Sequence, residues 1–251
     1  MTTEVVNTPE HPILSHLLEL RSRIVIILLA VTIGAIIGWI VYPVAFELVA
    51  GPLLKSVKAF GGHVFTLQPG EAFFTQCKLA MVIGIVLASP VIMWQLWLFV
   101  RPALTEKERK AISPLMPAIS VLFIAGVVFG YYLLPSILQF FLGYVPHGVA
   151  PNMDFQNSIN FPLKLMLTFG LVFQLPIVIL GLIAFGVLTP TVLLKQWRVA
   201  IIAIAVLAAI LSPSPDPFNM IVVMMPLLML YFGTVLLAYW LQRKEKKTDV
   251  S

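Results

Sequence analysis

Long stretches without a charged side chain divide this sequence between residues 24 and 242. A helix that crosses a bilayer needs about 20 apolar residues, and six stretches of 17 to 43 uncharged residues are present: 24–46, 79–100, 111–153, 165–194, 199–215 and 217–242. Only 11% of the chain is charged and 60% is apolar, whereas a soluble domain carries about 25% charged residues. The sequence therefore predicts an all-α, polytopic membrane protein.

Six transmembrane helices are expected, near 24–42, 76–99, 115–141, 161–185, 199–213 and 219–240. The second part of the 43-residue stretch is rich in Pro, Gly and Asn, so it is predicted to be a loop. The fifth span has only 13 residues from Val199 to Leu211, about 20 Å of helix against about 30 Å of bilayer hydrocarbon. Either Arg198 snorkels and the bilayer thins there, or protein shields this helix.

The Lys and Arg residues give the orientation. Twelve of the sixteen lie on one side of a six-span arrangement, which places both termini in the cytoplasm by the positive-inside rule. The predicted organisation is a cytoplasmic N-terminal amphipathic helix at 1–23, one six-helix transmembrane domain at 24–240 and a cytoplasmic basic tail at 241–251. A short amphipathic helix is expected at 48–60, in the first outer loop. The net charge of +5 thus reflects membrane topology, and no nucleic-acid partner is expected.

Patterns of catalysis and cofactor binding do not occur in the sequence. Cys77 is the only cysteine, the four histidines form no i, i+4 pair, and there is no GxSxG, HExxH or phosphate-binding glycine loop. We therefore predict that the chain is not an enzyme, and we expect no metal and no cofactor.

Two acidic residues near the cytoplasmic surface, Glu19 and Glu108, can each be interpreted as having a structural role or a binding role. Glu19 and Arg23 are spaced i, i+4, which suits a solvated ion pair, although Glu19 is also placed to contact a cationic ligand. Glu108 follows Thr105 by three residues, as in a capping box that starts a helix. A binding role is the alternative for Glu108 as well.

Gln174 is the strongly polar residue of the fourth predicted span. An intramembrane polar side chain is a functional hypothesis by default. The competing explanation is a hydrogen bond between helices, which is favoured here because Pro176 disturbs the same turn. As a neutral amide, Gln174 does not itself carry a proton.

Several short motifs follow one another along residues 11–240. The first is HLLELR at 16–21, and the longest is WLFVRPALTEKER at 97–109. The others are AGPL at 50–53, ASP at 88–90, FQLP at 173–176 and SPSPD at 212–216. In this order they resemble the motifs of TatC, the multispanning subunit of the twin-arginine protein translocase, and the motif at 97–109 is the most specific of them. Family members span the membrane six times with both termini inside, which matches the topology predicted above.

This resemblance implies a signal-peptide receptor and core subunit in the inner membrane of a prokaryote. It would bind peptides with consecutive arginines and recruit single-span TatA and TatB-type subunits. The proton motive force would then drive folded proteins across the membrane. A homo-oligomer in the receptor complex and contact with membrane lipid are expected as further interactions.

The resemblance also implies roles for individual residues. Glu19 and Glu108 would form the acidic patch for the arginine pair, shaped by Arg21, Phe99, Pro102, Leu104 and Arg109. In the outer loops the matching positions are Pro52, Asp154 and Asp216. Gln174 stands where the family usually has Glu, so a titrating role is not expected there, and a polar contact to the peptide or a single-span partner is the functional alternative.

Two other functions fit a chain of this composition. An ion-coupled small-solute transporter would use Gln174 and the proline-broken helices as a midplane site. The missing internal repeat and the lack of carboxylates in the spans argue against it. A purely structural assembly subunit would neither bind arginine-pair peptides nor carry a solute.

Overall fold

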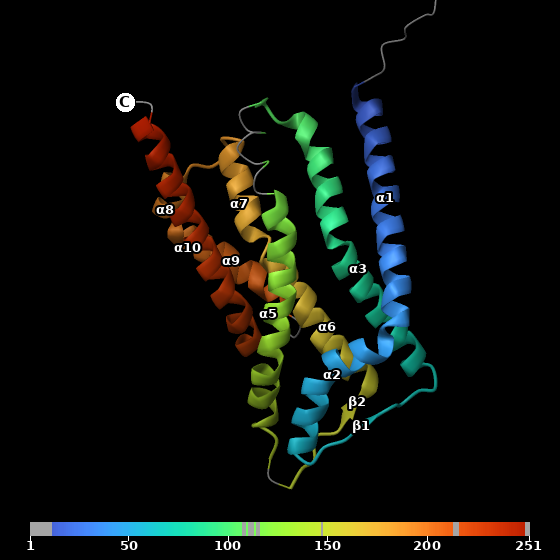
Figure 1. Cartoon of the computed structure of the whole chain (residues 1–251). Coiled ribbons are helices and arrows are strands. Elements are labelled where there is room, and N and C mark those ends of the chain that lie inside the picture. Colours follow the sequence, from blue (N-terminus) through green and yellow to red (C-terminus); the bar gives the residue numbers. More distant parts are fainter. Residues whose placement is uncertain are drawn as a thin grey trace, which may run out of the picture.

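Helices make up most of the molecule (Figure 1). The computed structural model describes residues 12–106, 109, 113, 116–146, 148–212 and 216–248. The long helices are α1 (Pro12–Ile40), α3 (Glu71–Val100), α5 (Met116–Leu142), α6 (Phe155–Val172) and α10 (Pro217–Thr248). The shorter ones are α2 (Tyr42–Ala59), η1 (Arg101–Ala103), α7 (Leu175–Ala184), α8 (Pro190–Lys195) and α9 (Trp197–Leu211).

The spanning helices agree with the predicted topology. Five segments are long and apolar enough to cross a membrane, namely α1, α3, α5, α6 together with α7, and α10. The 15-residue apolar helix α9 is the sixth; at 1.5 Å per residue it is about 22 Å long. The prediction of a polytopic helical membrane protein with a short fifth span is therefore confirmed.

The start of α1 and the end of α10 lie at the same end of the molecule (Figure 1), as an even number of crossings requires. We call this the inner end and the opposite one the outer end. Helix α1 continues from Pro12 into its span without a break, and α10 continues past residue 240 to Thr248. Of the expected terminal segments at 1–23 and 241–251, the structure describes residues 12–23 and 241–248. Each of these parts is continuous with a spanning helix.

The outer end contains more regular structure than the sequence suggested. The amphipathic helix expected at 48–60 is present as α2, which begins earlier, at Tyr42, and buries Val49, Ala50, Leu53 and Val57. Strand β1 (Val64–Phe65) pairs in parallel with β2 (Met153–Asp154). This two-residue pairing, which we did not predict, joins the first outer loop to the second.

The fourth span is broken and is not one continuous helix at 161–185. Helix α6 ends at Val172 and α7 begins at Leu175. Pro176 explains the break, because proline has no N–H to donate and its ring clashes with the carbonyl four residues earlier. The Val172 carbonyl therefore receives no hydrogen bond from residue 176, whereas the Leu171 and Gln174 carbonyls accept from the N–H groups of Gln174 and Ile177.

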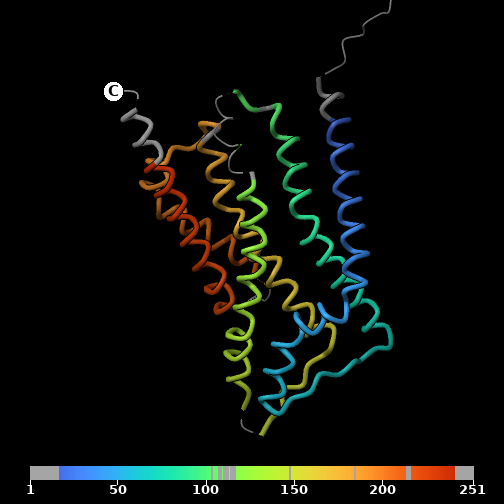
Figure 2. Tube along the Cα trace, in the orientation of Figure 1, coloured from blue at the N-terminus to red at the C-terminus, as the bar shows by residue number. Residues whose placement is uncertain are grey.

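Two kinds of packing hold the spans together. Leu134 of α5, Phe169 of α6 and Leu227 of α10 are fully buried in the main core. Helix α1 instead lies along α3 through small residues (Figure 2). A Cβ on Gly34 would lie 2.7 Å from the Gly84 oxygen, and one on Gly84 would lie 2.6 Å from the Ala35 nitrogen. Only glycine permits so close an approach of two helices.

Candidate site at the inner end

A chain of polar contacts connects α1 with α3 near the inner end. Arg23 Nη2 pairs with Glu19 Oε1 at 2.9 Å, one turn away on α1. Arg23 Nη1 donates to Gln95 Oε1 of α3 at 3.0 Å. Gln95 is buried and Arg23 is 22% exposed. The guanidinium thus binds both an acid on its own helix and an amide on the neighbouring one.

Glu19 forms the ion pair that its spacing predicted. Its side chain is 33% exposed, so the carboxylate is reachable from the inner surface while one oxygen is bound to Arg23. The contact shows that a guanidinium fits against this carboxylate. A second cation approaching Glu19 would meet a partly neutralised charge.

The segment after Gln95 carries most of the other predicted site residues. Phe99 lies one turn beyond Gln95 on α3 and is half-buried, so the two side chains lie on one face of that helix. Pro102 belongs to η1 and is exposed, and Leu104 directly after it is half-buried. These residues therefore extend the inner-end surface that begins at the Arg23–Gln95 contact.

Three predicted residues are less closely tied to this surface. Arg21 is exposed on α1, and Arg109 is exposed after η1. The Arg109 N–H donates to the Thr105 oxygen at 2.9 Å, which is helical hydrogen bonding at the position where the capping box was expected. Glu108 lies outside the described residues.

Gln95 is the inner-end residue that sequence reasoning missed. It lies inside the predicted span at 76–99, where a polar side chain needs a partner. That signal was available, but its partner Arg23 is 72 positions away, and no local pattern connects them.

Gln174 lies at the break between α6 and α7. Its Nε2 donates to the Ile119 oxygen of α5 at 3.1 Å. This contact favours the structural reading of Gln174, as a hydrogen bond between helices next to the Pro176 break.

Asp154 and Asp216 come together at the outer end. Asp154 Oδ2 accepts from the Asn157 N–H at 3.0 Å, and Asp216 Oδ1 accepts from the Asn219 N–H at 2.8 Å. Each is therefore placed to cap the start of a helix, α6 and α10 respectively. Both line a cavity of about 440 Å³ that Leu53 of α2 also lines. Pro52 lies within α2, and its oxygen accepts from the Ser56 hydroxyl.

Within the described ranges, no group of three or more His, Cys, Asp or Glu side chains is arranged to hold a metal ion. The polar groups that meet at the Arg23 contact are one carboxylate (Glu19), one amide (Gln95) and one guanidinium. Such a set can form charge-assisted hydrogen bonds with a further charged group.

Known proteins resemble this chain over nearly its whole length. Residues 15–226 match the family described as Sec-independent protein translocase protein (TatC). The TatC proteins of Carboxydothermus hydrogenoformans and Aquifex aeolicus are each 35% identical to it, covering 92% and 94% of this chain and 93% and 98% of their own lengths.

A solved structure shares the fold as well. The crystal structure of the twin arginine translocase receptor TatC in DDM aligns with a TM-score of 0.77 and 35% identity, over 89% of this chain and 99% of its own. This chain is thus a multi-pass protein of the inner membrane and belongs to the TatC family of protein translocase subunits.

Proposed function

We propose that this chain is the signal-peptide receptor and core subunit of a twin-arginine translocase. The observation that carries the proposal is the Glu19–Arg23–Gln95 contact, in which an inner-surface carboxylate already accepts a guanidinium. An arginine of a signal peptide offers the same group. The solved relative described as a twin arginine translocase receptor supports this reading.

The chemistry of the site favours arginine over lysine. A guanidinium presents a planar fork of donors that binds a carboxylate through two parallel hydrogen bonds, whereas an ammonium is a point charge. Charge-assisted hydrogen bonds contribute about 1.5–3 kcal/mol each. Two arginines bound by Glu19 and Glu108 would thus reach micromolar affinity at the order-of-magnitude level. The part assigned to Glu108 rests on its position in the family motif.

Arg23 gives this site an internal competitor. An incoming arginine that binds Glu19 shares the carboxylate with Arg23 or displaces it, and Gln95 remains as an acceptor for the displaced guanidinium. Phe99, Pro102 and Leu104 would supply the apolar wall beside the peptide, with Arg21 and Arg109 at its edge. No covalent step is involved, and the work of transport would come from proton motive force.

Single-span subunits of the TatA and TatB type are the proposed partners, since six helices line no channel wide enough for a folded protein. The exposed apolar face of the short helix α9 is the proposed docking region, and Ile202 and Ile210 on it are 66% and 74% exposed. In a Cys77→Ala background, Ile202→Cys is expected to crosslink to such a subunit, and Leu28→Cys on α1 is the matched exposed control. Crosslinks through Leu28→Cys alone would refute the placement. A homo-oligomer of this chain in the receptor complex is part of the same proposal.

Binding of a labelled signal peptide to the purified protein in detergent tests the receptor function. An arginine-pair peptide is compared with a lysine-pair peptide on the unmodified protein and on the Glu19→Gln and Glu108→Gln variants. Loss of one charge-assisted hydrogen bond should weaken arginine-pair binding by about tenfold or more. Glu47→Gln, an exposed acid on α2 at the outer end, is the control and should bind as the unmodified protein does. Equal affinity for both peptides, unchanged in the two variants, would overturn the proposal.

A further inference from the structure

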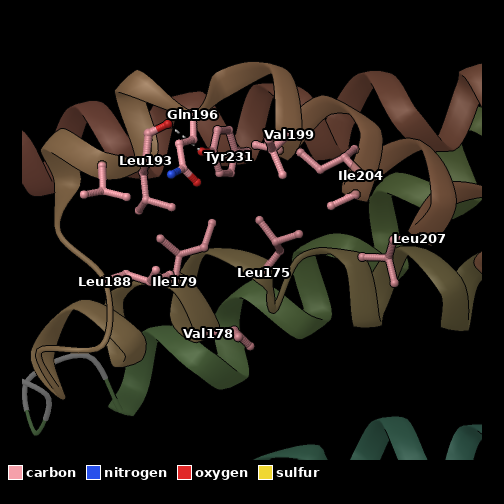
Figure 3. A pocket seen from close by; sticks show the side chains of 13 residues that line it. Leu175, Val178, Ile179, Leu188, Leu193, Gln196, Val199, Ile204, Leu207 and Tyr231 are labelled. Carbon is pink, nitrogen blue, oxygen red and sulfur yellow. Dashed lines mark hydrogen bonds between the residues drawn. The ribbon is translucent and has the colours of Figure 1, made fainter.

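An apolar cavity of about 330 Å³ lies between α7, α8, α9 and α10, away from the inner-end site (Figure 3). Leu175 and Ile179 of α7 face Leu193, Val199 and Ile204 across it. Its lining runs from Gln196, directly before α9, to Leu207 on α9. Those eleven residue steps correspond to about 16 Å of helix, so the cavity is elongated along α9.

The interior offers hydrogen-bonding groups at only two of its thirteen lining side chains, Gln196 and Tyr231. The Tyr231 hydroxyl donates to the Leu193 oxygen at 3.1 Å, which satisfies it and ties α10 to α8. The other lining residues are Leu, Val, Ile and Ala. A ligand of this cavity is therefore hydrocarbon along its length.

The cavity is open on the side that a bilayer would cover. Val178, Val192 and Val199, which line it, are 58%, 42% and 62% exposed. Its volume of about 330 Å³ extends over about 16 Å of length, so the cavity is a narrow groove that is open along one side. A single hydrocarbon chain fits along it.

The end of the cavity at Gln196 is basic. Lys195 and Arg198 flank Gln196 and are both exposed, and the Arg198 guanidinium lies 5.5 Å from the centre of the Trp197 ring. No Asp or Glu occurs between Asp154 and Asp216, so α7, α8 and α9 carry no acid that offsets these two charges. A Trp next to basic residues at the start of a span is typical of the membrane interface.

We propose that this cavity binds one acyl chain of an anionic phospholipid, whose headgroup phosphate lies beside Lys195 and Arg198. Lys195 and Arg198 form the rim of the cavity. Their positive charge selects an anionic headgroup, because basic residues near a membrane surface attract such lipids. The short helix α9 places this rim and the deep end of the cavity within the reach of one leaflet. A lipid bound here would fill the space between α7, α8, α9 and α10. Its binding would be independent of peptide binding at the inner end.

Native mass spectrometry of the full chain in detergent tests the proposal. The protein is mixed with equal amounts of a phosphatidylglycerol and a phosphatidylcholine that carry the same acyl chains. The unmodified protein is expected to retain the phosphatidylglycerol preferentially. Ala203→Phe fills the cavity and should lower the retained lipid about tenfold, whereas Ala209→Phe, an exposed residue of α9 that does not line the cavity, should leave it unchanged.

The rim is tested with Lys195→Gln and Arg198→Gln, which affect only exposed side chains and keep the test valid even if Ala203→Phe fails to fold. Each removed charge should lower the preference for phosphatidylglycerol about fivefold, and Lys55→Gln at the outer end is the control. Unchanged retention in Ala203→Phe, equal loss in Ala209→Phe, or equal binding of the two lipids would each overturn the proposal. So would a result in which Ala203→Phe keeps the lipid but loses a co-purifying single-span subunit, since the cavity would then serve a protein partner.

Discussion

Replacing Gly84 with alanine should separate α1 from α3. An added Cβ would lie 2.6 Å from the Ala35 nitrogen and 2.8 Å from the Val31 oxygen, both in the backbone of α1. Ordinary contacts of a Cβ start at 3.4 Å, so α1 must shift by about 0.6–0.8 Å. Because helix backbone does not yield as the end of a flexible side chain does, overpacking of this kind costs about 1–3 kcal/mol.

Gly233→Ala is the matched control for this substitution. Gly233 also lies in a spanning helix, α10, but nothing is within 4 Å of its added Cβ. Alanine is a better helix former than glycine by about 0.5–1 kcal/mol, so the control should be neutral or slightly stabilising. The free energy of unfolding of Gly84→Ala should fall below that of Gly233→Ala by about 1–3 kcal/mol.

Unfolding of both variants in mixed detergent micelles, followed by circular dichroism, measures this difference. Arginine-pair peptide binding adds a second readout, because Arg23 reaches Gln95 only while α1 lies close to α3. We expect weaker peptide binding by Gly84→Ala and none of this loss in Gly233→Ala. Equal stability of the two variants would show that α1 does not pack on α3 through this glycine contact.

Three further substitutions test individual hydrogen bonds. Asp154→Ala removes the cap of α6 and should cost about 0.5–2 kcal/mol of stability, visible as a lower midpoint of thermal unfolding. Thr168→Val removes the hydroxyl that donates to the Leu211 oxygen at the end of α9 and should cost about 0.5–1.5 kcal/mol in the same assay. Gln174→Leu removes the contact with Ile119 and should cost about 0.6 kcal/mol while peptide binding stays unchanged. Lost peptide binding at unchanged stability would contradict the structural role of Gln174.

The spans and their direction were predictable from local sequence. A bilayer demands about 20 apolar residues for each crossing, so charged residues mark the boundaries directly, and the bias of Lys and Arg gives the orientation. Pro176 indicated a break in the fourth span, although we predicted that span as one helix at 161–185. Its start at Phe155 and the start of α2 at Tyr42 were misplaced because polar outer segments carry a weaker signal than apolar ones.

The candidate site was predictable only in part. Glu19 and Arg23 are one helical turn apart, so their ion pair follows from spacing. Gln95 was missed because it enters the site from another helix. The peptide-binding roles proposed for Glu19 and Glu108 came from the motif resemblance and not from local chemistry.

The sequence alone thus determined that this is a membrane protein with six crossings, the apolar part of each crossing and which family the chain resembles. Only the tertiary structure decided that Arg23 contacts Gln95, that Gly34 lies against Gly84, that β1 pairs with β2 and that α7 to α10 enclose a cavity. The physical reason is that the bilayer acts on each segment separately, so composition along the chain reveals it. Contacts between helices depend on shape and on residues far apart in the chain, and no local pattern encodes them.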